Sequence, residues 1–236
     1  MKFRLVQIEL TNRCNFDCPF CFRKRMTREQ GIMTEDTFKQ SIKLVKSMKI
    51  PEVWLHNWGE PLLHPDIVKF INMGKQLKIG FTTNGKLLSK DLILELKKAG
   101  LSCLDISVNM DTNKFSLIHL LTSYTYANLH GLDCHLRVVV QNSAEYLYLH
   151  DMLKGYKVRW QRVMLRTGVR KDPCQAVNHV FVILWDGTIV PCCHVINKEI
   201  TYGSLSNPAI NPTNIDSSYC NQCSEIDEEM PVKWKL

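Results

Sequence analysis

The feature that most constrains the fold is a repeated alternation between short β-rich runs and segments with helical spacing. Runs rich in β-branched, aromatic and aliphatic residues predict six strands, at residues 3–10, 52–56, 78–83, 103–109, 134–141 and 158–165. Segments of helical period between them predict helices at about 34–48, 66–76, 89–99, 114–130 and 144–154. Successive βα units with right-handed crossovers form an open parallel sheet or a barrel, complete at eight strands and partial at six. We therefore predict an α/β fold, a partial (βα)6 TIM-like barrel.

Polar motifs follow the predicted strands. TNRC comes after the first strand, NWGEP after the second, TTNG after the third, SVN at the fourth and QN after the fifth. In parallel α/β folds, functional side chains gather at the carboxyl ends of the strands. The sequence therefore predicts one site at that end of the sheet.

The pattern changes after about residue 172. The run HVFVILWDGTIVPCC predicts two strands joined by a turn at Asp186 and Gly187, and the rest is rich in Asn, Pro, Ser and Cys. Such a segment has too small a core to order itself, and a metal site would supply the missing stability. We expect a barrel domain at residues 1–170 and a small metal-binding module with a β-hairpin at residues 171–236.

The composition limits the cellular environment and the binding partners that we expect for this protein. The start, MKFRLVQIEL, carries charge within four residues, and no stretch of about 18 uncharged apolar residues occurs, so we expect a cytoplasmic protein without membrane contact. Ten cysteines in a reducing compartment indicate metal ligands more than disulfides. The net charge of +7 suits an acidic partner. Nucleic acid is not expected, because no basic run is interleaved with aromatic residues.

Three cysteines lie close together in TNRCNFDCPFCF: Cys14, Cys18 and Cys21. Three thiolates at CxxxCxxC spacing can hold three irons of a cubane cluster and leave the fourth iron without a protein ligand. A structural zinc site needs a fourth Cys or His, and none lies nearby in the sequence, although a distant residue could supply it. The spacing favours an iron–sulfur cluster, with zinc as the alternative.

With Phe20 before its third cysteine, this motif resembles the CxxxCx(aromatic)C signature of the radical S-adenosylmethionine (radical SAM) superfamily. The resemblance implies a [4Fe-4S] cluster on Cys14, Cys18 and Cys21 whose open iron binds the amino and carboxylate groups of SAM. It also implies the chemistry: reductive cleavage of SAM gives methionine and a 5′-deoxyadenosyl radical that takes hydrogen from a substrate.

Two further motifs resemble the SAM contacts of the family. NWGEP is similar to the GGEP motif, with Trp58 in place of the first glycine, and implies that Gly59 and Glu60 hold the methionine amino group. Thr83 and Asn84 in TTNG match the turn after the third strand of the family. An ordinary Asn-Gly turn is the alternative for the second motif.

The fourth and fifth strands carry the remaining candidates for binding SAM. Ser107 and Asn109 lie where the family often has SxD, which contacts the ribose or the methionine carboxylate, and here asparagine replaces the aspartate. Asn142 resembles an asparagine that contacts the ribose in the family. Arg137 lies inside a strand, where a buried arginine needs a partner, and we expect it to reach the methionine carboxylate.

One residue is a candidate substrate contact. Arg162 and Arg166 are four apart, which places them on one face of a strand, and Arg166 lies near the strand end. There it would bind a carboxylate or phosphate of a substrate. Surface charge is the alternative.

Four cysteines near the C-terminus predict a second metal site. The hairpin brings Cys174 and Cys192 together, and Cys220 and Cys223 form a C-x2-C pair. Such a set suits either zinc or a fully liganded [4Fe-4S] cluster. Beside a radical SAM core, the pattern resembles the auxiliary-cluster modules called SPASM and twitch. No cysteine follows Cys223, so the resemblance implies the shorter twitch module with one auxiliary cluster.

The second site has two adjacent candidate ligands. Cys193 follows Cys192 directly, and adjacent strand residues point to opposite faces, so only one of them readily reaches a cluster. We choose Cys192 because it completes the Gly-x4-Cys spacing from Gly187.

A fully liganded second cluster suits electron transfer, and the overall layout is similar to that of the aminocyclitol dehydrogenase of butirosin biosynthesis. The resemblance implies a radical SAM oxidoreductase that dehydrogenates a small polar molecule, with the auxiliary cluster as electron acceptor and an acidic flavodoxin or ferredoxin as donor. One alternative is radical modification of a ribosomally made peptide, by thioether cross-linking or epimerisation. Another is a non-catalytic binding protein stabilised by zinc.

Overall fold

A computed structural model describes residues 3–109, 112, 114–162 and 178–211 of the chain. Its centre is an eight-stranded sheet in the order β6-β5-β4-β3-β2-β1-β7-β8. The strands are β1 (Leu5–Ile8), β2 (Glu52–Trp54), β3 (Lys78–Thr83), β4 (Cys103–Val108), β5 (Asp133–Val140), β6 (Val158–Arg162), β7 (Val180–Ile183) and β8 (Ile189–Val190). From β1 to β6 each strand pairs in parallel with the next. This confirms the predicted α/β fold with a partial barrel.

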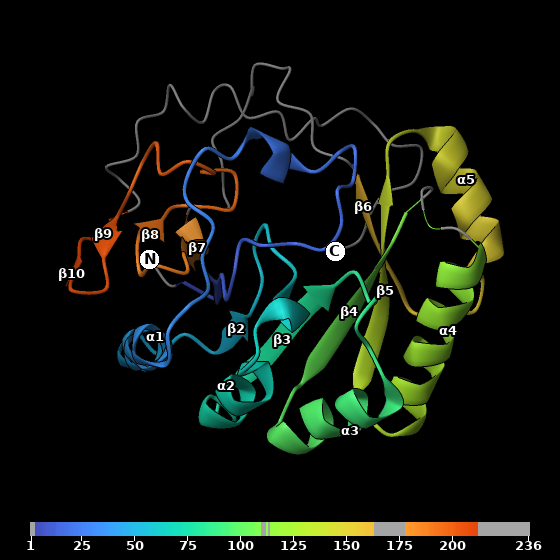
Figure 1. Ribbon diagram of the computed structural model, residues 1–236, viewed down its shortest axis with the longest axis horizontal. Helices are drawn as coiled ribbons and strands as arrows, with labels where there is room; N and C mark the ends of the chain where they lie inside the picture. The colour runs from blue at the N-terminus through green and yellow to red at the C-terminus, as the bar shows by residue number, and fades with distance from the viewer. Residues whose placement is uncertain (1–2, 110–111, 113, 163–177, 212–236) are drawn as a thin grey trace.

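Five α-helices connect these strands on the outside of the curved sheet (Figure 1). They are α1 (Glu35–Ser47), α2 (Ile67–Met73), α3 (Lys90–Ala99), α4 (Lys114–Leu129) and α5 (Ser143–Met152), with short 3-10 helices η1 (Phe22–Arg25) and η2 (Pro61–Leu63). The side chains of Thr34 and Ser89 cap α1 and α3, as their positions in the sequence predict. Figure 1 shows the segment with η1 at the end toward which β3, β4 and β5 point.

The predicted elements occur in the predicted order, with different lengths. β1 is shorter than the predicted strand at 3–10, and α2 stops at Met73 because Gly74 is its C-cap. The structure describes β6 as far as Arg162, and the rest of the predicted strand at 158–165 lies outside the described residues.

The predicted hairpin forms, and it joins the barrel sheet. β7 pairs in parallel with β1, with Val6 opposite Phe181 and Ile8 opposite Ile183. β8 returns antiparallel to β7 after a turn in which Gly187 has a φ of 85°. A two-residue pair, β9 (Gly203–Ser204) and β10 (Asn207–Pro208), follows. The predicted domain boundary near residue 170 falls outside the described residues.

The core lies between the sheet and the helices and continues under the hairpin. Phe38 of α1 stacks on Phe70 of α2, with ring centroids 4.3 Å apart, and both side chains are fully buried. A smaller apolar cluster, formed by Val182, Leu184, Val190 and Val195, lies under the hairpin. Among the described helices, none combines the length and the apolar character that crossing a membrane requires.

Candidate functional site

A cavity of about 960 Å³ lies inside the partial barrel. Its walls come from side chains of successive strands, and the loop of residues 14–22 forms another part of the lining. The strand residues that line it are Gln7, Thr82, Thr83, Ser107, Arg137, Val139 and Gln161. Because strand side chains alternate between two faces, Gln7, Ser107, Arg137 and Gln161 lie on the inner face of their strands, while their apolar neighbours pack into the core on the outer face.

The three cysteines of the first motif all line this cavity and are partly exposed. Burial raises the pKa of the Cys14 thiol, and the backbone N–H of Phe16, which donates to Cys14 Sγ at 3.4 Å, acts in the opposite direction. Three sulfur donors on one short loop, all bordering the same cavity, fit a cubane cluster with one iron open to that cavity.

Gly59 allows two loops of the site to touch. The Glu60 backbone N–H donates to the carbonyl of Arg13 at 2.8 Å, which joins the loop after β2 to the loop that carries the cysteines. A Cβ atom at Gly59 would lie 2.7 Å from the Thr11 carbonyl carbon and 2.9 Å from the Arg13 carbonyl oxygen. Only glycine fits this approach, which gives the glycine of the GEP sequence a structural reason.

The Glu60 carboxylate joins the ends of β2 and β3. It is 2% exposed, and it accepts hydrogen bonds from Leu62 N at 3.0 Å, Thr83 Oγ1 at 2.7 Å and Asn84 N at 2.8 Å. Burial raises the pKa of Glu60, and these hydrogen bonds act against that rise. Glu60, Thr83 and Asn84 all border the cavity, so the two motifs form one rigid edge of it.

Asn84 connects this edge to the cysteine loop. Its side-chain amide donates to Asn15 Oδ1 at 2.7 Å and lies 4.0 Å from Cys14 Sγ. The Lys86 backbone N–H donates to Asn84 Oδ1 at 3.0 Å, as in a polar turn. The TTNG segment is therefore both a turn and a contact to the cysteine loop.

The other predicted contacts divide into three groups. Phe20, Ser107, Asn109 and Arg137 line the cavity. Asn142 is not among the lining residues; its side chain caps α5 by accepting from Glu145 N at 3.0 Å, and its ribose contact stays a prediction. The predicted residues Arg166, Cys174, Cys220 and Cys223 lie outside the described residues and stay predictions.

Trp58, at the position where the family has glycine, contacts both the loop of residues 14–22 and the segment that carries Cys192 and Cys193. Its indole N–H donates to the carbonyl of Cys193 at 2.5 Å. Its ring meets Phe22 edge-on at 5.6 Å and lies 6.4 Å from the ring of His194. Cys193 lines the cavity, and Cys192, the predicted ligand of the second site, precedes it in the same loop.

His56 is a cavity residue that belongs to none of the sequence motifs described above. Its Nδ1 accepts from the Thr82 backbone N–H at 3.2 Å, so the proton of the neutral ring is on Nε2. Burial, with a smaller contribution from Arg137, lowers the pKa of His56 to about 3. The position directly after β2 was the available signal, because the carboxyl end of a barrel strand is where site residues occur.

Sequence comparison establishes the family. The model of the Radical SAM superfamily matches residues 8–171, which is most of the chain, and the protein therefore belongs to this superfamily. SAM and the [4Fe-4S] cluster of the superfamily are the cofactors that this membership implies, and Cys14, Cys18 and Cys21 fit the cluster.

Curated relatives match part of the chain. A "Probable GTP 3',8-cyclase" of Saccharolobus islandicus is 33% identical over 137 residues, which are 57% of this chain and 41% of that protein. The "Tungsten-containing aldehyde ferredoxin oxidoreductase cofactor-modifying protein" of Pyrococcus furiosus is 31% identical over 136 residues, 53% of this chain and 36% of that one. The matched region thus spans less than half the length of these relatives.

Solved structures match nearly the whole chain in fold. BtrN in complex with AdoMet and 2-DOIA aligns with a TM-score of 0.65 and 19% identity, over 93% of this chain and 87% of BtrN. SuiB of Streptococcus suis bound to S-adenosylmethionine aligns at 0.68 and 16%, over 92% and 67%. anSMEcpe with bound AdoMet aligns at 0.68 and 12%, over 92% and 82%. The described part of the chain therefore shares its fold with BtrN, SuiB and anSMEcpe.

Proposed function

We propose that this radical SAM enzyme oxidises a small polar molecule by net dehydrogenation, with an auxiliary [4Fe-4S] cluster as acceptor of the second electron. The observation that carries the proposal is a set of polar side chains on the strand wall of the cavity, those of Gln7, Ser107, Arg137 and Gln161. Such a wall suits hydrogen bonding to a hydroxylated or charged substrate. The BtrN-like layout supports the same reaction class.

In this proposal, three groups of residues have separate roles. Cys14, Cys18 and Cys21 would hold the cluster that, with SAM, supplies a 5′-deoxyadenosyl radical. The edge formed by Glu60, Thr83 and Asn84 would orient the methionine part of SAM. The barrel wall encloses the reacting groups, which keeps water and other hydrogen donors away from them.

The reaction balances for an alcohol substrate. A hydrogen atom leaves the carbon that bears the hydroxyl group and ends on 5′-deoxyadenosine. The remaining substrate radical then loses one electron and the hydroxyl proton, which gives a carbonyl compound. Cys174, Cys192, Cys220 and Cys223 would hold an auxiliary cluster, which would supply the electron acceptor. We assign the enzyme to the reducing cytoplasm, where thiols stay reduced.

Peptide modification is the second candidate. Among the similar structures are SuiB bound to its precursor peptide SuiA, with a TM-score of 0.68, and anSMEcpe bound to AdoMet and the Cp18Cys peptide, with a TM-score of 0.65. The same fold therefore accommodates peptides in those proteins.

Metal analysis tests the proposal first. Iron, sulfide and zinc are measured in anaerobically purified enzyme and in the Cys14→Ala/Cys18→Ala/Cys21→Ala variant. We expect about eight irons per chain, falling to about four in the variant, and 5′-deoxyadenosine formation from SAM and dithionite only in the wild type. One cubane with one zinc would move the reaction to redox-neutral chemistry, and zinc alone in an iron-replete preparation would refute radical chemistry.

A further inference from the structure

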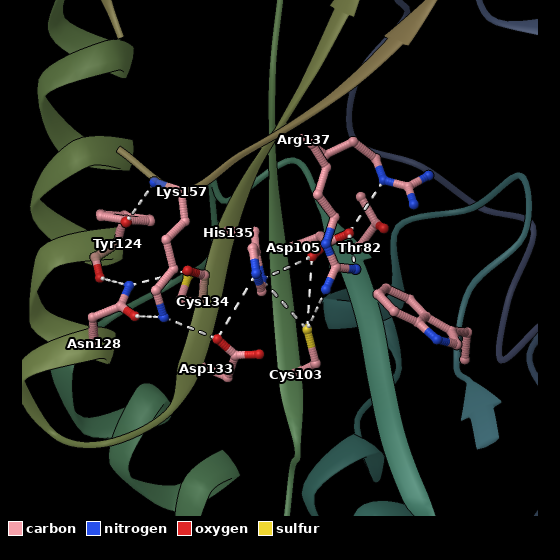
Figure 2. Close-up of polar contacts among 12 residues, drawn as sticks. Thr82, Cys103, Asp105, Tyr124, Asn128, Asp133, Cys134, His135, Arg137 and Lys157 are labelled. Carbon is pink, nitrogen blue, oxygen red and sulfur yellow. Dashed lines mark hydrogen bonds and ion pairs between the residues drawn. The ribbon is translucent and has the colours of Figure 1, made fainter. Parts of the chain in front are cut away.

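Three side chains with metal-binding atoms converge near the amino ends of β4 and β5 (Figure 2). They are Cys103 and Asp105 of β4 and His135 of β5, and the register pairs Asp105 with His135. None of the three is among the described residues that line the cavity, and the reaction proposed above gives them no role. Cys103 is 4% exposed and Asp105 0%, whereas the side chain of His135 is 18% exposed. The cluster is therefore buried and reaches solvent on the side of His135.

The ligand atoms of this cluster form a nearly equilateral triangle. Cys103 Sγ lies 3.7 Å from His135 Nδ1 and 3.8 Å from Asp105 Oδ1, and the third side, from His135 Nδ1 to Asp105 Oδ1, is 3.8 Å. Zinc in tetrahedral coordination, with bonds of about 2.0–2.3 Å to nitrogen, oxygen and sulfur, holds its ligand atoms about 3.3–3.8 Å apart. The observed separations lie at the upper end of that range, so small side-chain shifts suffice to bind one zinc ion.

His135 also has the outer partner that a metal-binding histidine commonly has. Such a histidine is usually oriented by a carboxylate at its second ring nitrogen. Here His135 Nε2 lies 3.8 Å from Asp133 Oδ1, and Lys157 Nζ holds that carboxylate oxygen at 3.1 Å. The ring can therefore present Nδ1 to a metal while its Nε2–H faces Asp133.

Two arginines are the outer partners of the other two ligands. Asp105 Oδ2 accepts from Arg137 Nε and Arg159 Nη1, each at 3.2 Å. This leaves Asp105 Oδ1 as the oxygen of the triangle. Arg159 Nη2 lies 3.5 Å from Cys103 Sγ, and N–H donors make such contacts to metal-bound thiolates too. The positive charges of the arginines lower the affinity for a cation, so we expect moderate affinity.

We propose that Cys103, Asp105 and His135 form a zinc-binding site on the inner face of β4 and β5. Three protein ligands leave the fourth tetrahedral position to a water molecule. On binding, the thiol of Cys103 gives its proton to solvent, and this proton competes with zinc because burial raises the pKa of the thiol to about 11. The bound ion joins β4 to β5 and stabilises the folded chain. This site does not depend on the reaction proposed above.

Zinc binding by the cluster-loaded enzyme tests the site. The wild type, Cys103→Ala, His135→Phe and Cys134→Ala are dialysed anaerobically against buffered free zinc, and zinc and iron per chain are then measured. We expect the wild type and Cys134→Ala to hold about one zinc per chain more than the other two variants. Cys134→Ala is the matched control, because it removes a thiol of the adjacent strand that is 0% exposed and belongs to the apolar core.

X-ray absorption at the zinc edge identifies the ligands, because iron does not contribute to it. We expect one sulfur neighbour at about 2.3 Å and nitrogen or oxygen neighbours at about 2.0–2.2 Å in the zinc that Cys103→Ala loses. A zinc ion on the four cysteines of the proposed auxiliary site has sulfur neighbours only and remains in Cys103→Ala. The two kinds of zinc site are distinguished in this way.

Asp133→Ala tests the outer partner of His135. Asp133 is a positioning residue, because it acts on the metal through the imidazole ring. Its loss should weaken zinc binding about 10- to 100-fold in the same dialysis experiment, while the single sulfur neighbour stays. An unchanged zinc affinity would refute this role of Asp133.

The site is refuted if Cys103→Ala and His135→Phe hold as much zinc as the wild type, or if the zinc they lose has no sulfur neighbour. Iron content shows whether each variant is folded. As a second measurement, zinc should raise the Tm of the wild type and Cys134→Ala but not that of Cys103→Ala. The 5′-deoxyadenosine assay reports on the proposed function separately. Enzyme that cleaves SAM but binds no zinc here retains the radical chemistry and loses the site.

Discussion

At the scale of single residues, Gly59 is a position of the site where no larger side chain fits. A Cβ there would overlap the backbone of Thr11 and Arg13, which cannot move aside as a flexible side chain would. We expect Gly59→Ala to separate the loop after β2 from the cysteine loop and to lower the free energy of unfolding by about 1–3 kcal/mol. Urea unfolding under anaerobic conditions, with iron content measured in parallel, checks this.

Gly155 is the control for that substitution. It also has a positive φ, of 92°, but nothing lies within 4 Å of a Cβ built on it. Gly155→Ala therefore carries only backbone strain, about 1–2 kcal/mol, and should leave the iron content at the wild-type level. Equal iron content in the Gly59 and Gly155 variants would contradict the close-approach argument.

His56 predicts a specific pH dependence of stability. In the unfolded chain it takes up a proton below about pH 6.5, whereas in the folded protein its pKa is about 3. The folded state is thus disfavoured as the pH falls from 6.5 toward 3. His56→Asn keeps an acceptor for Thr82 N–H and does not titrate. The difference in unfolding free energy, wild type minus variant, should therefore fall by about 2 kcal/mol between pH 7 and pH 5.

Urea unfolding of both proteins at the two pH values gives this difference directly. A difference that stays constant would mean that His56 is as easily protonated in the folded protein as in the unfolded chain.

The meeting of Cys14, Cys18 and Cys21 with the GEP and TTNG residues at one cavity could be predicted, because their spacing along the chain carries the information. The role of Asp105 could not be predicted, because strand register sets its partners. Asp105 meets Arg137 and Arg159 only once β4, β5 and β6 are aligned, and no local pattern places residues 32 and 54 positions apart together. Asn142 shows the reverse case, since its capping interaction with Glu145 is local in the sequence and the N-cap position before α5 predicts it.

At the scale of elements, Arg28 connects the segment after the cysteine motif to β1 and to the segment at Ile196. It forms a bidentate ion pair with Glu9, at 2.7 and 2.6 Å, and donates to the Ile196 carbonyl at 2.7 Å. Glu9 is 0% exposed, so Arg28→Met leaves a buried carboxylate with only Asn57 as a side-chain partner among the described residues. We expect a loss of about 3–5 kcal/mol in the free energy of unfolding.

The Glu9→Gln/Arg28→Met double variant tests the cause of that loss. If the unpaired charge is responsible, the double variant is more stable than Arg28→Met alone in the same urea experiment. A double variant that is less stable would assign the effect to lost packing of the arginine side chain.

The hairpin is a structural part of the barrel, because its strand β7 pairs with β1. Leu5–Ile8 pairs with Val180–Ile183, and Phe3 meets Phe181 edge-on at 5.1 Å. A chain that ends at residue 170 would expose this strand edge and the apolar residues beneath it. We expect such a truncated chain to aggregate, as size-exclusion chromatography would show. A monomeric truncated chain with wild-type helix content would contradict this expectation.

The six barrel strands and the hairpin were predictable from periodicity and turn residues. The position of the hairpin was not, because the pairing of residues 5–8 with 180–183 joins segments that no sequence periodicity relates. Strand lengths were also overestimated where an apolar run continued past the last paired residue, as at β1, whose sequence run extends to Leu10.

At the scale of the whole molecule, the net charge of +7 predicts how the electron donor docks. An acidic flavodoxin should associate through long-range attraction that salt screens, with a screening length of about 10 Å at 0.1 M ionic strength. We expect the rate of SAM cleavage at limiting flavodoxin to fall several-fold between about 0.05 and 0.5 M salt. Dithionite, a small reductant, serves as the control and should show little change. Equal salt dependence with both reductants would place the effect outside donor docking.

The pairing of β1 with β7 has a consequence for how the protein is made. The ribosome completes the first strand early, but its second neighbour emerges only after residue 183 has been synthesised. Contacts of such long sequence separation form slowly, since a large loop must close first. The cysteine loop follows β1 directly, and its surroundings near Cys193 are also late in the chain. Cluster insertion in the cell is therefore expected to be post-translational. The yield of holoenzyme then depends on how long the completed apoprotein survives before iron and sulfide are delivered.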